Sequence, residues 1–288
     1  MPSLRSLGAL TLAALGAGSA LALVPAAARA QQAGVTAVPD SVLQRVDQIF
    51  AGFRGESPGC AVGVSQQGKP VLTRAYGMAN LEYGVPNTPE TVFESGSVAK
   101  QFTAAALVLL AQDGKLSLDD DIRKYLPEVP DFGHTITIRH LLTHTSGLRD
   151  QWGLLALKGS PPGSQVHTLP LILDLVAHQK QLNFEPGTDY LYSNTGYALA
   201  AMLVQRASGK SLAEFGRERL FGPLGMTSTQ WRDDYTRVVK GRAIAYEPAA
   251  SVSPQTSRNP LNSMELRLQR ERTGRGHGDA RMPSPGCG

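Results

Sequence analysis

Cysteine is scarce in this sequence, with Cys60 and Cys287 the only two among 288 residues. Two cysteines so far apart do not make a disulfide framework, so the small stapled folds of many secreted proteins are excluded. A metal site also lacks support. His140 and His144 are spaced by four residues, but no Glu or third ligand accompanies them. We therefore expect both histidines to be structural.

Aromatic residues make up only 6% of the chain, and the net positive charge arises at its two ends. The formal net charge is +4, yet six arginines lie from Arg258 onward, against three acidic residues. The middle of the chain has no basic face with interleaved aromatic residues, which argues against a nucleic-acid-binding surface. The whole chain is 42% apolar and 18% charged, values that are typical of a folded soluble protein.

Charge is absent from residues 7–24, a run of mostly Leu, Ala and Gly that follows Arg5. This run and the A-x-A unit at residues 28–30 predict a secretory signal peptide over residues 1–30, cleaved after Ala30. A transmembrane anchor is the alternative, but the run is short for a membrane span. We therefore expect a periplasmic or secreted protein, with no stable membrane span after cleavage.

Hydrophobic periodicity and turn residues divide residues 31–248 into short strands and helices. Residues 60–65 and 71–76 flank a turn containing Gly and Pro, which predicts a β-hairpin. Residues 249–288 are rich in Arg, Gly and Pro and contain no Lys, so we expect a disordered tail there. Helices are predicted over residues 41–53, 97–112, 118–126, 138–144, 169–179, 194–208 and 211–220.

An S-x-x-K unit, Ser97 to Lys100, opens the most regular predicted helix. Three residues make nearly one helical turn, so the two side chains share a face. A serine hydroxyl needs a neighbouring base to become nucleophilic, and a lysine serves as that base when burial lowers its pKa. By itself the unit is weak evidence, because a Ser near a helix start and a solvated Lys often stand at this spacing by chance.

A Y-x-N unit, Tyr192 to Asn194, lies in a loop just before another predicted helix. A tyrosine beside Ser and Lys relays protons, and an Asn amide holds a substrate carbonyl. The alternative is a tyrosine-rich turn, since Tyr190 and Tyr197 lie nearby. Each of the two units occurs once in the chain, which makes their combination more informative than either alone.

Both units, with the segments around them, resemble the β-lactamase-related serine hydrolases. This family holds class C β-lactamases, D-Ala-D-Ala carboxypeptidases and related esterases and peptidases. The resemblance runs from about residue 42 to residue 246 in the family order. It is carried by FESGSVAKQFT (93–103), GKLSLDD (114–120), IRHLLTHTSGL (138–148), FEPG (184–187), YSN (192–194) and PLGM (223–226).

The resemblance implies an α+β, β-lactamase/transpeptidase-like fold, in which an antiparallel sheet flanked by helices meets a mainly helical region at the active site. It implies that Ser97 attacks a carbonyl to form an acyl-enzyme, that Lys100 and Tyr192 move protons, and that Asn194 orients the substrate. The implied substrates are small molecules or peptidoglycan peptides, namely D-Ala-D-Ala peptides, β-lactams or esters. No metal or organic cofactor is implied, and the oligomeric state is left open.

The family's third motif, a Lys or His with Gly two places on, is missing from these 288 residues. In the family this motif lies on a strand that supplies an oxyanion donor, whose loss slows catalysis on the order of a hundredfold or more. We therefore expect residues 31–248 to form a partial hydrolase domain with an incomplete sheet. An exported serine hydrolase is the first functional hypothesis. The alternatives are an inactive truncated member that acts at most as a binding module, and a tail that anchors the protein to an anionic surface.

A shifted reading frame is our hypothesis for the change in composition near Ala249, because shifted GC-rich sequence tends to encode Arg, Gly and Pro. Resequencing the gene and translating the other frames downstream of that residue is expected to reveal a Lys- or His-x-Gly strand and a closing helix. The hypothesis is wrong if no frame encodes them.

Overall fold

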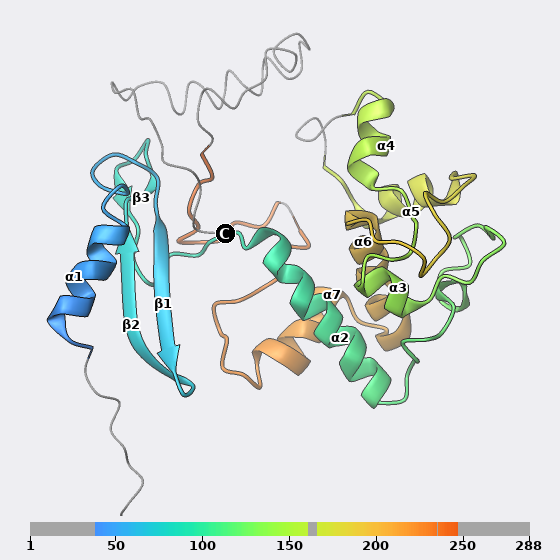
Figure 1. The fold of residues 1–288 in the computed structure, drawn as a ribbon, viewed down its shortest axis with the longest axis horizontal. Helices are drawn as coiled ribbons and strands as arrows, with labels where there is room; N and C mark the ends of the chain where they lie inside the picture. Colours follow the sequence, from blue (N-terminus) through green and yellow to red (C-terminus); the bar gives the residue numbers. More distant parts are fainter. Residues whose placement is uncertain (1–37, 161–165, 235, 247–288) are drawn as a thin grey trace, which may run out of the picture.

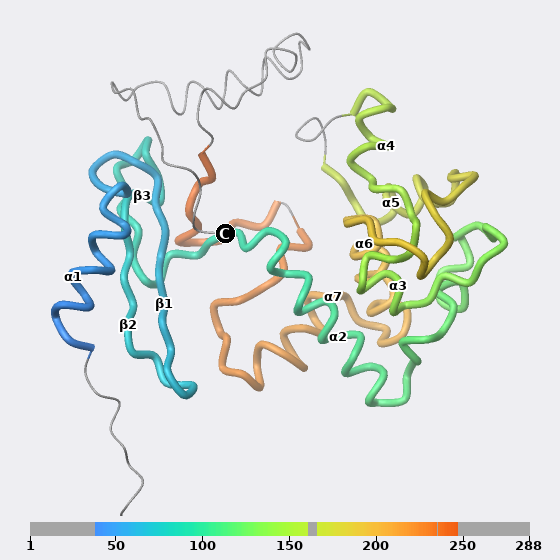
Figure 2. The backbone as a smooth tube through the Cα atoms, viewed as in Figure 1, coloured from blue at the N-terminus to red at the C-terminus, as the bar shows by residue number. Residues whose placement is uncertain are grey.

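The computed structural model describes residues 38–160, 166–234 and 236–246. A β-hairpin with one helix beside it is followed by a group of short helices, so the α+β architecture expected from the sequence is confirmed. Figures 1 and 2 show the hairpin and its helix at the left of the view and the helical region at the right. The predicted signal peptide and the predicted tail lie outside the described residues.

The hairpin consists of β1 (Cys60–Gln66) and β2 (Lys69–Tyr76), which pair antiparallel. Gln67 and Gly68 between them both have positive φ, 51° and 74°, as a tight two-residue hairpin turn requires. Two short strands, β3 (Met78–Asn80) and β4 (Val85–Pro86), form a second small sheet. The predicted hairpin is therefore confirmed, with its strands one or two residues longer than expected.

The helix α1 (Asp40–Ile49) packs beside the hairpin through aromatic and polar contacts at the end of β2. The ring of Phe50 stacks on the ring of Tyr76, with centroids 4.9 Å apart. The Tyr76 hydroxyl donates a hydrogen bond to the Asp47 carboxylate at 2.7 Å. Burial, followed by this carboxylate, raises the pKa of Tyr76 to about 12. The hydroxyl therefore stays protonated and keeps its role as donor.

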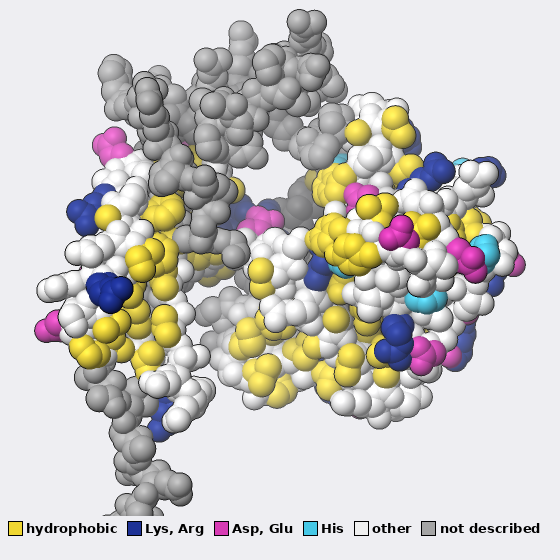
Figure 3. All heavy atoms as spheres, viewed as in Figure 1, with side chains coloured by type: hydrophobic (Ala, Val, Ile, Leu, Met, Phe, Trp, Pro, Cys, Tyr) yellow, Lys and Arg dark blue, Asp and Glu magenta, His cyan; other side chains and the backbone are white. Residues whose placement is uncertain are grey.

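Neither outer edge of the hairpin has a partner strand among the described residues, because β1 and β2 pair only with each other. Hydrophobic side chains gather along this hairpin in the space-filling view (Figure 3), and Val64 on β1 is 45% exposed. Sheets of two strands bury little apolar surface by themselves. The incomplete sheet remains a prediction, since residues 247–288 lie outside the described part of the chain.

The helical region is built around α2 (Lys100–Gln112) and α6 (Asn194–Ser208). Around α6 pack α3 (Ile138–Leu142), α4 (Gln151–Leu157), α5 (Leu169–Ala177) and α7 (Leu212–Gly216). None of the described helices is long and apolar enough to cross a membrane. The fully buried side chains of this core include Ala106, Leu107, Ile122, Leu126, Ile138, Leu141, Val176, Leu199, Ala200, Leu203 and Val204.

The ends of α6 are set by residues that the sequence places at capping positions. The Ser193 hydroxyl accepts a hydrogen bond from the Gly196 backbone N–H, and Gly209 at the other end has φ 73°. Serine is a preferred N-cap, and glycine adopts the left-handed conformation that ends a helix without steric strain. The predicted range of 194–208 is therefore confirmed at both ends.

Several other predicted boundaries are wrong. The helix expected from Ser97 begins at Lys100, because residues Gly96–Ala99 form a 3₁₀ turn. The stretch expected after residue 118 is a 3₁₀ turn at Ile122–Lys124, capped by the Asp121 side chain. The helix expected over 211–220 divides into α7 and a π-helical turn at Arg217–Phe221. Helix α4 was not predicted.

The last described segment returns from the helical region to the small sheet. The Val92 backbone N–H donates to the Gly241 carbonyl at 2.9 Å, and the Ala243 N–H donates to the Val92 carbonyl at 2.9 Å. The Ile244 N–H donates to the Ala79 carbonyl at 2.8 Å. Segments about 150 residues apart in sequence thus lie side by side just before the Ser97 turn.

Replacing Leu203 with Ala tests the helical core. Leu203 is fully buried in α6, so Leu203→Ala is expected to lower the free energy of unfolding by about 2–5 kcal/mol. Leu157→Ala is the matched control, because the Leu157 side chain is 88% exposed and its loss should change stability by less than about 0.5 kcal/mol. Urea unfolding followed by circular dichroism measures both. Equal effects would mean that α6 is not at the centre of the core.

Candidate active site

The four side chains singled out in the sequence lie at the starts of two helices. Ser97 is in the 3₁₀ turn that leads into α2, and Lys100 is the first residue of α2. Tyr192 is in the loop before α6, and Asn194 is the first residue of α6. The structure therefore brings together two segments that are more than 90 residues apart in sequence.

The sharp turn before Ser97 depends on Gly96, whose φ of 54° lies in the left-handed region. A Cβ added at this glycine would meet nothing within 4 Å, so the backbone conformation and not space requires glycine. The following turn exposes the Ser97 side chain, while Lys100 is half-buried. This geometry presents the hydroxyl to solvent and keeps the lysine behind it.

Ser97 Oγ has two hydrogen-bond partners. Tyr192 Oη lies 2.7 Å from Oγ, and either atom can be the donor. Lys100 Nζ donates to the same Oγ at 3.1 Å. Both groups are within the distance that proton transfer to or from a reacting hydroxyl requires.

Lys100 is held by three further groups. Its Nζ donates to Asn194 Oδ1 at 2.9 Å and lies 4.9 Å from the centroid of the Tyr192 ring and 5.6 Å from that of the Tyr197 ring. Aromatic rings at this distance attract an ammonium group. The Nζ atom therefore has a defined position between Ser97 and Asn194.

The electrostatics of the site act on Tyr192. A hydrogen bond from Lys100, followed by the hydrogen bond with Ser97, lowers the pKa of the Tyr192 phenol from its usual value. Donors to the phenolate oxygen have this effect because they favour the charged form, and the positive charge of Lys100 adds to it. The Tyr192 side chain is 41% exposed, so its proton also exchanges readily with solvent. A phenol of lowered pKa next to a serine is suited to act as a general base.

His144 contacts the site, although its sequence position suggested only a structural role. Its ring lies 4.4 Å from the Tyr192 ring and 5.3 Å from the Tyr197 ring, measured between centroids. Its Nδ1 accepts a hydrogen bond from the Ser193 backbone N–H at 3.1 Å. Burial, followed by the Lys100 charge, lowers the pKa of His144, so the ring is neutral at pH 7. His144 therefore packs against the loop that carries Tyr192.

His140 has a different environment from His144. Its Nδ1 accepts from the Thr137 backbone N–H at 3.3 Å and thereby completes the capping box of α3. Among the described residues no cluster of three His, Cys, Asp or Glu side chains is arranged to hold a metal ion.

Asp150 is a site residue that sequence reasoning missed. Its Oδ2 accepts hydrogen bonds from the backbone N–H of Asn194 at 2.5 Å and from Asn194 Nδ2 at 3.2 Å. The one feature of the sequence that could have indicated a role for Asp150 is its position directly before residues 151–157. There its side chain caps α4 by accepting a hydrogen bond from the Trp152 N–H at 3.0 Å. Nothing in the spacing indicated a contact with Asn194, 44 residues further along.

Comparisons with known proteins agree on one family. The sequence model of the family described as Beta-lactamase matches residues 46–282, which extends past the expected boundary at residue 248. A D-aminopeptidase of Cereibacter sphaeroides (strain ATCC 17023) is 32% identical over 213 residues, covering 74% of this chain and 40% of that protein. Penicillin-binding protein 4* of Bacillus subtilis (strain 168) is 34% identical over 167 residues, covering 58% of this chain and 36% of that protein. The chain thus spans less than half the length of these curated relatives.

Solved structures give the same result. A penicillin-binding protein homologue from Pyrococcus abyssi matches with a TM-score of 0.60 and 28% identity, over 73% of this chain and 47% of that one. A D-amino acid amidase from Ochrobactrum anthropi SV3 matches with a TM-score of 0.60 and 30% identity, over 75% of this chain and 59% of that one. Similarity in sequence and similarity in fold therefore point to one family.

The lowered pKa of Tyr192 makes a prediction about pH. If the phenolate accepts the Ser97 proton, the rate at which a fluorophosphonate labels Ser97 rises with pH, with a midpoint below about 10, the ordinary value for tyrosine. Tyr192→Phe is expected to remove this rise and to slow labelling about 10²- to 10⁴-fold. Tyr83→Phe, a change at a tyrosine that is 83% exposed and lies between β3 and β4, is the control. An unchanged pH profile in Tyr192→Phe would show that another group is the base.

Proposed function

Because the chain belongs to the beta-lactamase family of serine hydrolases, we propose that it acts through an acyl-enzyme formed on Ser97. The observation that carries the proposal is the pair of hydrogen bonds on Ser97 Oγ, one with Tyr192 Oη and one from Lys100 Nζ. A serine with two proton-transfer partners at these distances is an activated nucleophile.

The proposed first step is attack on a substrate carbonyl. Tyr192, as phenolate, accepts the Oγ proton while the Oγ–carbon bond forms. The nearby Lys100 ammonium stabilises the phenolate and the negative charge that develops in the transition state. The protonated Tyr192 then donates its proton to the leaving amine or alcohol as the carbonyl–leaving-group bond breaks.

The proposed second step is hydrolysis of the Ser97 ester by water. Tyr192, again a phenolate, accepts a proton from the attacking water as the water oxygen bonds to the carbonyl carbon. It then returns this proton to Ser97 Oγ as the ester bond to Oγ breaks and the acid product is released. We propose that Asn194, whose side chain accepts a hydrogen bond from Lys100, orients the substrate carbonyl. Proton transfer of this kind accounts for about 10²- to 10⁴-fold of a rate.

For the substrate we propose peptides or amides that contain a D-amino acid, ahead of β-lactams and esters. Support comes from relatives whose names are D-aminopeptidase and D-amino acid amidase, together with penicillin-binding proteins. We also propose export to the periplasm or exterior, on the signal-peptide pattern of residues 1–30.

A second candidate is an inactive family member that acts at most as a binding module. It is favoured by the absence of a Lys- or His-x-Gly unit from these 288 residues. Past β4, the described residues also contain no further strand beside the site. An inactive member would keep the Ser97 cluster without turning over substrate.

Intact-mass measurement after exposure to a fluorophosphonate, and separately to penicillin, tests the proposal. We expect a one-to-one adduct that is lost in Ser97→Ala. Ser95→Ala is the matched control, because the Ser95 side chain makes no capping hydrogen bond and lies two residues away. Release of p-nitroaniline from D-alanine p-nitroanilide, faster than from the L-isomer, would support the D-amino-acid substrate class.

Three other outcomes of these labelling and turnover measurements would favour a different function. Penicillin labelling without turnover of the D-anilide would favour a penicillin-binding role. Turnover of p-nitrophenyl esters alone would favour an esterase. No adduct with either probe, in a chain that unfolds cooperatively, would support the inactive binding module and contradict the proposed enzyme.

A further inference from the structure

The structure assigns to Asp150 the role of a positioning residue that fixes the orientation of the Asn194 side-chain amide and, through it, the position of Lys100. The inference rests on the proposed function, because it concerns the same Ser97 site. Asp150 does not touch Ser97, and its carboxylate is linked to the nucleophile through Asn194 and Lys100 in turn.

The orientation of the Asn194 amide follows from the groups on either side of it. An amide has an oxygen that only accepts and a nitrogen that only donates. Asp150 Oδ2 is an acceptor and faces Asn194 Nδ2 at 3.2 Å, whereas Lys100 Nζ is a donor and faces Asn194 Oδ1 at 2.9 Å. If the Asn194 amide were turned over, its oxygen would face the Asp150 acceptor and its nitrogen would face the Lys100 donor. Neither contact could then be a hydrogen bond. The carboxylate and the ammonium together therefore permit one orientation.

The same carboxylate also holds the backbone at the start of α6. Asp150 Oδ2 accepts from the Asn194 backbone N–H at 2.5 Å, so one oxygen binds two donors of the same residue. The other oxygen, Oδ1, accepts from the Trp152 N–H and caps α4. Asp150 thus joins the start of α4 to the start of α6, which carries Asn194.

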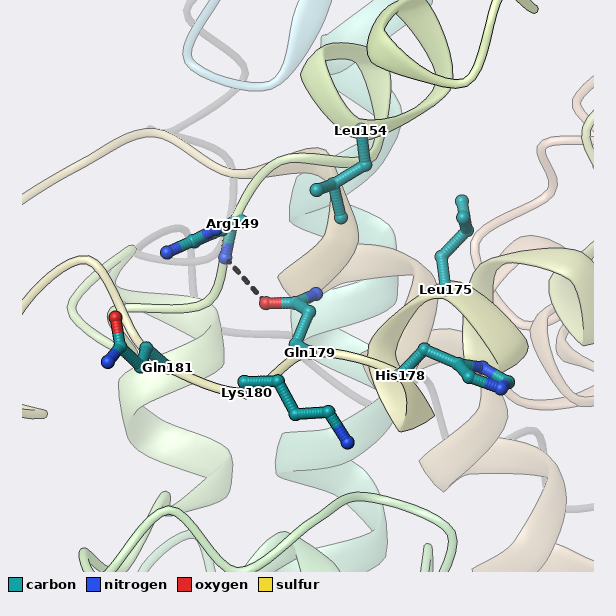
Figure 4. Close-up of a pocket in the computed structure, with 7 residues that line it drawn as sticks. All are labelled: Arg149, Leu154, Leu175, His178, Gln179, Lys180 and Gln181. Atoms are coloured by element: carbon teal, nitrogen blue, oxygen red, sulfur yellow. Dashed lines mark hydrogen bonds between the residues drawn. The ribbon is translucent and has the colours of Figure 1, made fainter.

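The backbone on both sides of Asp150 is fixed by buried polar side chains. Thr195 Oγ1, on a residue only 1% exposed, accepts from the Gln151 N–H at 2.7 Å and donates to the Arg149 carbonyl at 3.0 Å. Gln179, which is 7% exposed, accepts from the Arg149 N–H at 3.3 Å through its Oε1. Figure 4 shows this bond, with Gln179 reaching from the segment after α5 toward Arg149. The position of the carboxylate is therefore set by the packed helices and not by a free loop.

Asp150→Asn separates the orienting role from the capping role. Asparagine caps helices as well as aspartate, so the Trp152 N–H keeps an acceptor. In this variant the side-chain oxygen of residue 150 caps α4, which leaves the side-chain nitrogen facing Asn194. A nitrogen of this kind donates, so it can no longer accept from Asn194. The variant loses hydrogen bonds to a charged carboxylate, which are stronger than hydrogen bonds between neutral groups. We therefore expect fluorophosphonate labelling of Ser97 to slow about 10- to 100-fold.

The matched control is Asp121→Asn. Asp121 also caps a helical turn through its side chain, accepting from the backbone N–H two residues on at 2.8 Å, and it lies outside the Ser97 site. We expect this variant to label Ser97 within twofold of the original rate. Thermal unfolding of both variants shows that each is folded when its labelling is measured.

A reciprocal exchange tests the pairing itself. Asn194→Asp alone places two carboxylates face to face and is expected to slow labelling by a similar factor. Combined with Asp150→Asn, it returns one amide and one carboxylate to the pair, with Lys100 still facing an acceptor. We expect the double variant to label at least tenfold faster than the product of the two single effects predicts. Recovery is partial, because the backbone N–H of residue 194 then faces a donor.

The side-chain amide resonances of Asn194, identified by their loss in Asn194→Asp, report on the positioning without any chemistry at Ser97. We expect Asp150→Asn to shift them and Asp121→Asn to leave them in place. Labelling within twofold of the original in folded Asp150→Asn, multiplicative single effects, or unshifted Asn194 resonances would each overturn the inference. Absence of labelling in the original chain would instead count against the proposed function, while the resonances would still decide the role of Asp150.

Discussion

The packing of α2 against α6 is the contact on which the site depends. The two helices contact each other directly, and Ala106 and Leu107 of α2 and Ala200 and Leu203 of α6 are all fully buried in one core cluster. Lys100 and Asn194 are the first residues of these two helices, so the packing that buries the leucines also brings their side chains within 2.9 Å. The geometry of the Ser97 site thus follows from core packing that lies two or three helical turns away along α2 and α6.

From this contact a chain of polar groups extends in both directions. Toward solvent, Lys100 and Tyr192 meet at Ser97 Oγ. Toward the interior, Asn194 is held by Asp150, whose backbone neighbours are bound by Thr195 and Gln179. Donors and acceptors alternate from Ser97 Oγ to the Asp150 carboxylate, and polar groups paired in this way favour one arrangement over others. The hydroxyl at the exposed end is consequently held by groups that are themselves fixed.

The sequence predicted what depends on neighbours along the chain. Helix α6 was placed correctly at both ends because Ser193 and Gly209 are local capping signals. The start of α2 was placed three residues early, because the positive φ of Gly96 and the 3₁₀ turn after it depend on the loop that precedes them. Tyr192 was linked to Ser97 through a family resemblance and not through spacing. Asp150 was missed since its partner is 44 residues away and no local pattern encodes that contact.

We propose that Lys100 and Tyr192 act on Ser97 as one unit, and a double-mutant cycle tests this joint action most directly. Residues that act as a unit are strongly non-additive, because removing one already disables the other. We expect Lys100→Met and Tyr192→Phe each to slow fluorophosphonate labelling by a large and similar factor, with the combined variant no more than about threefold slower than the slower single variant. Single effects that multiply in the combined variant would show that the two groups act independently and would contradict the claim.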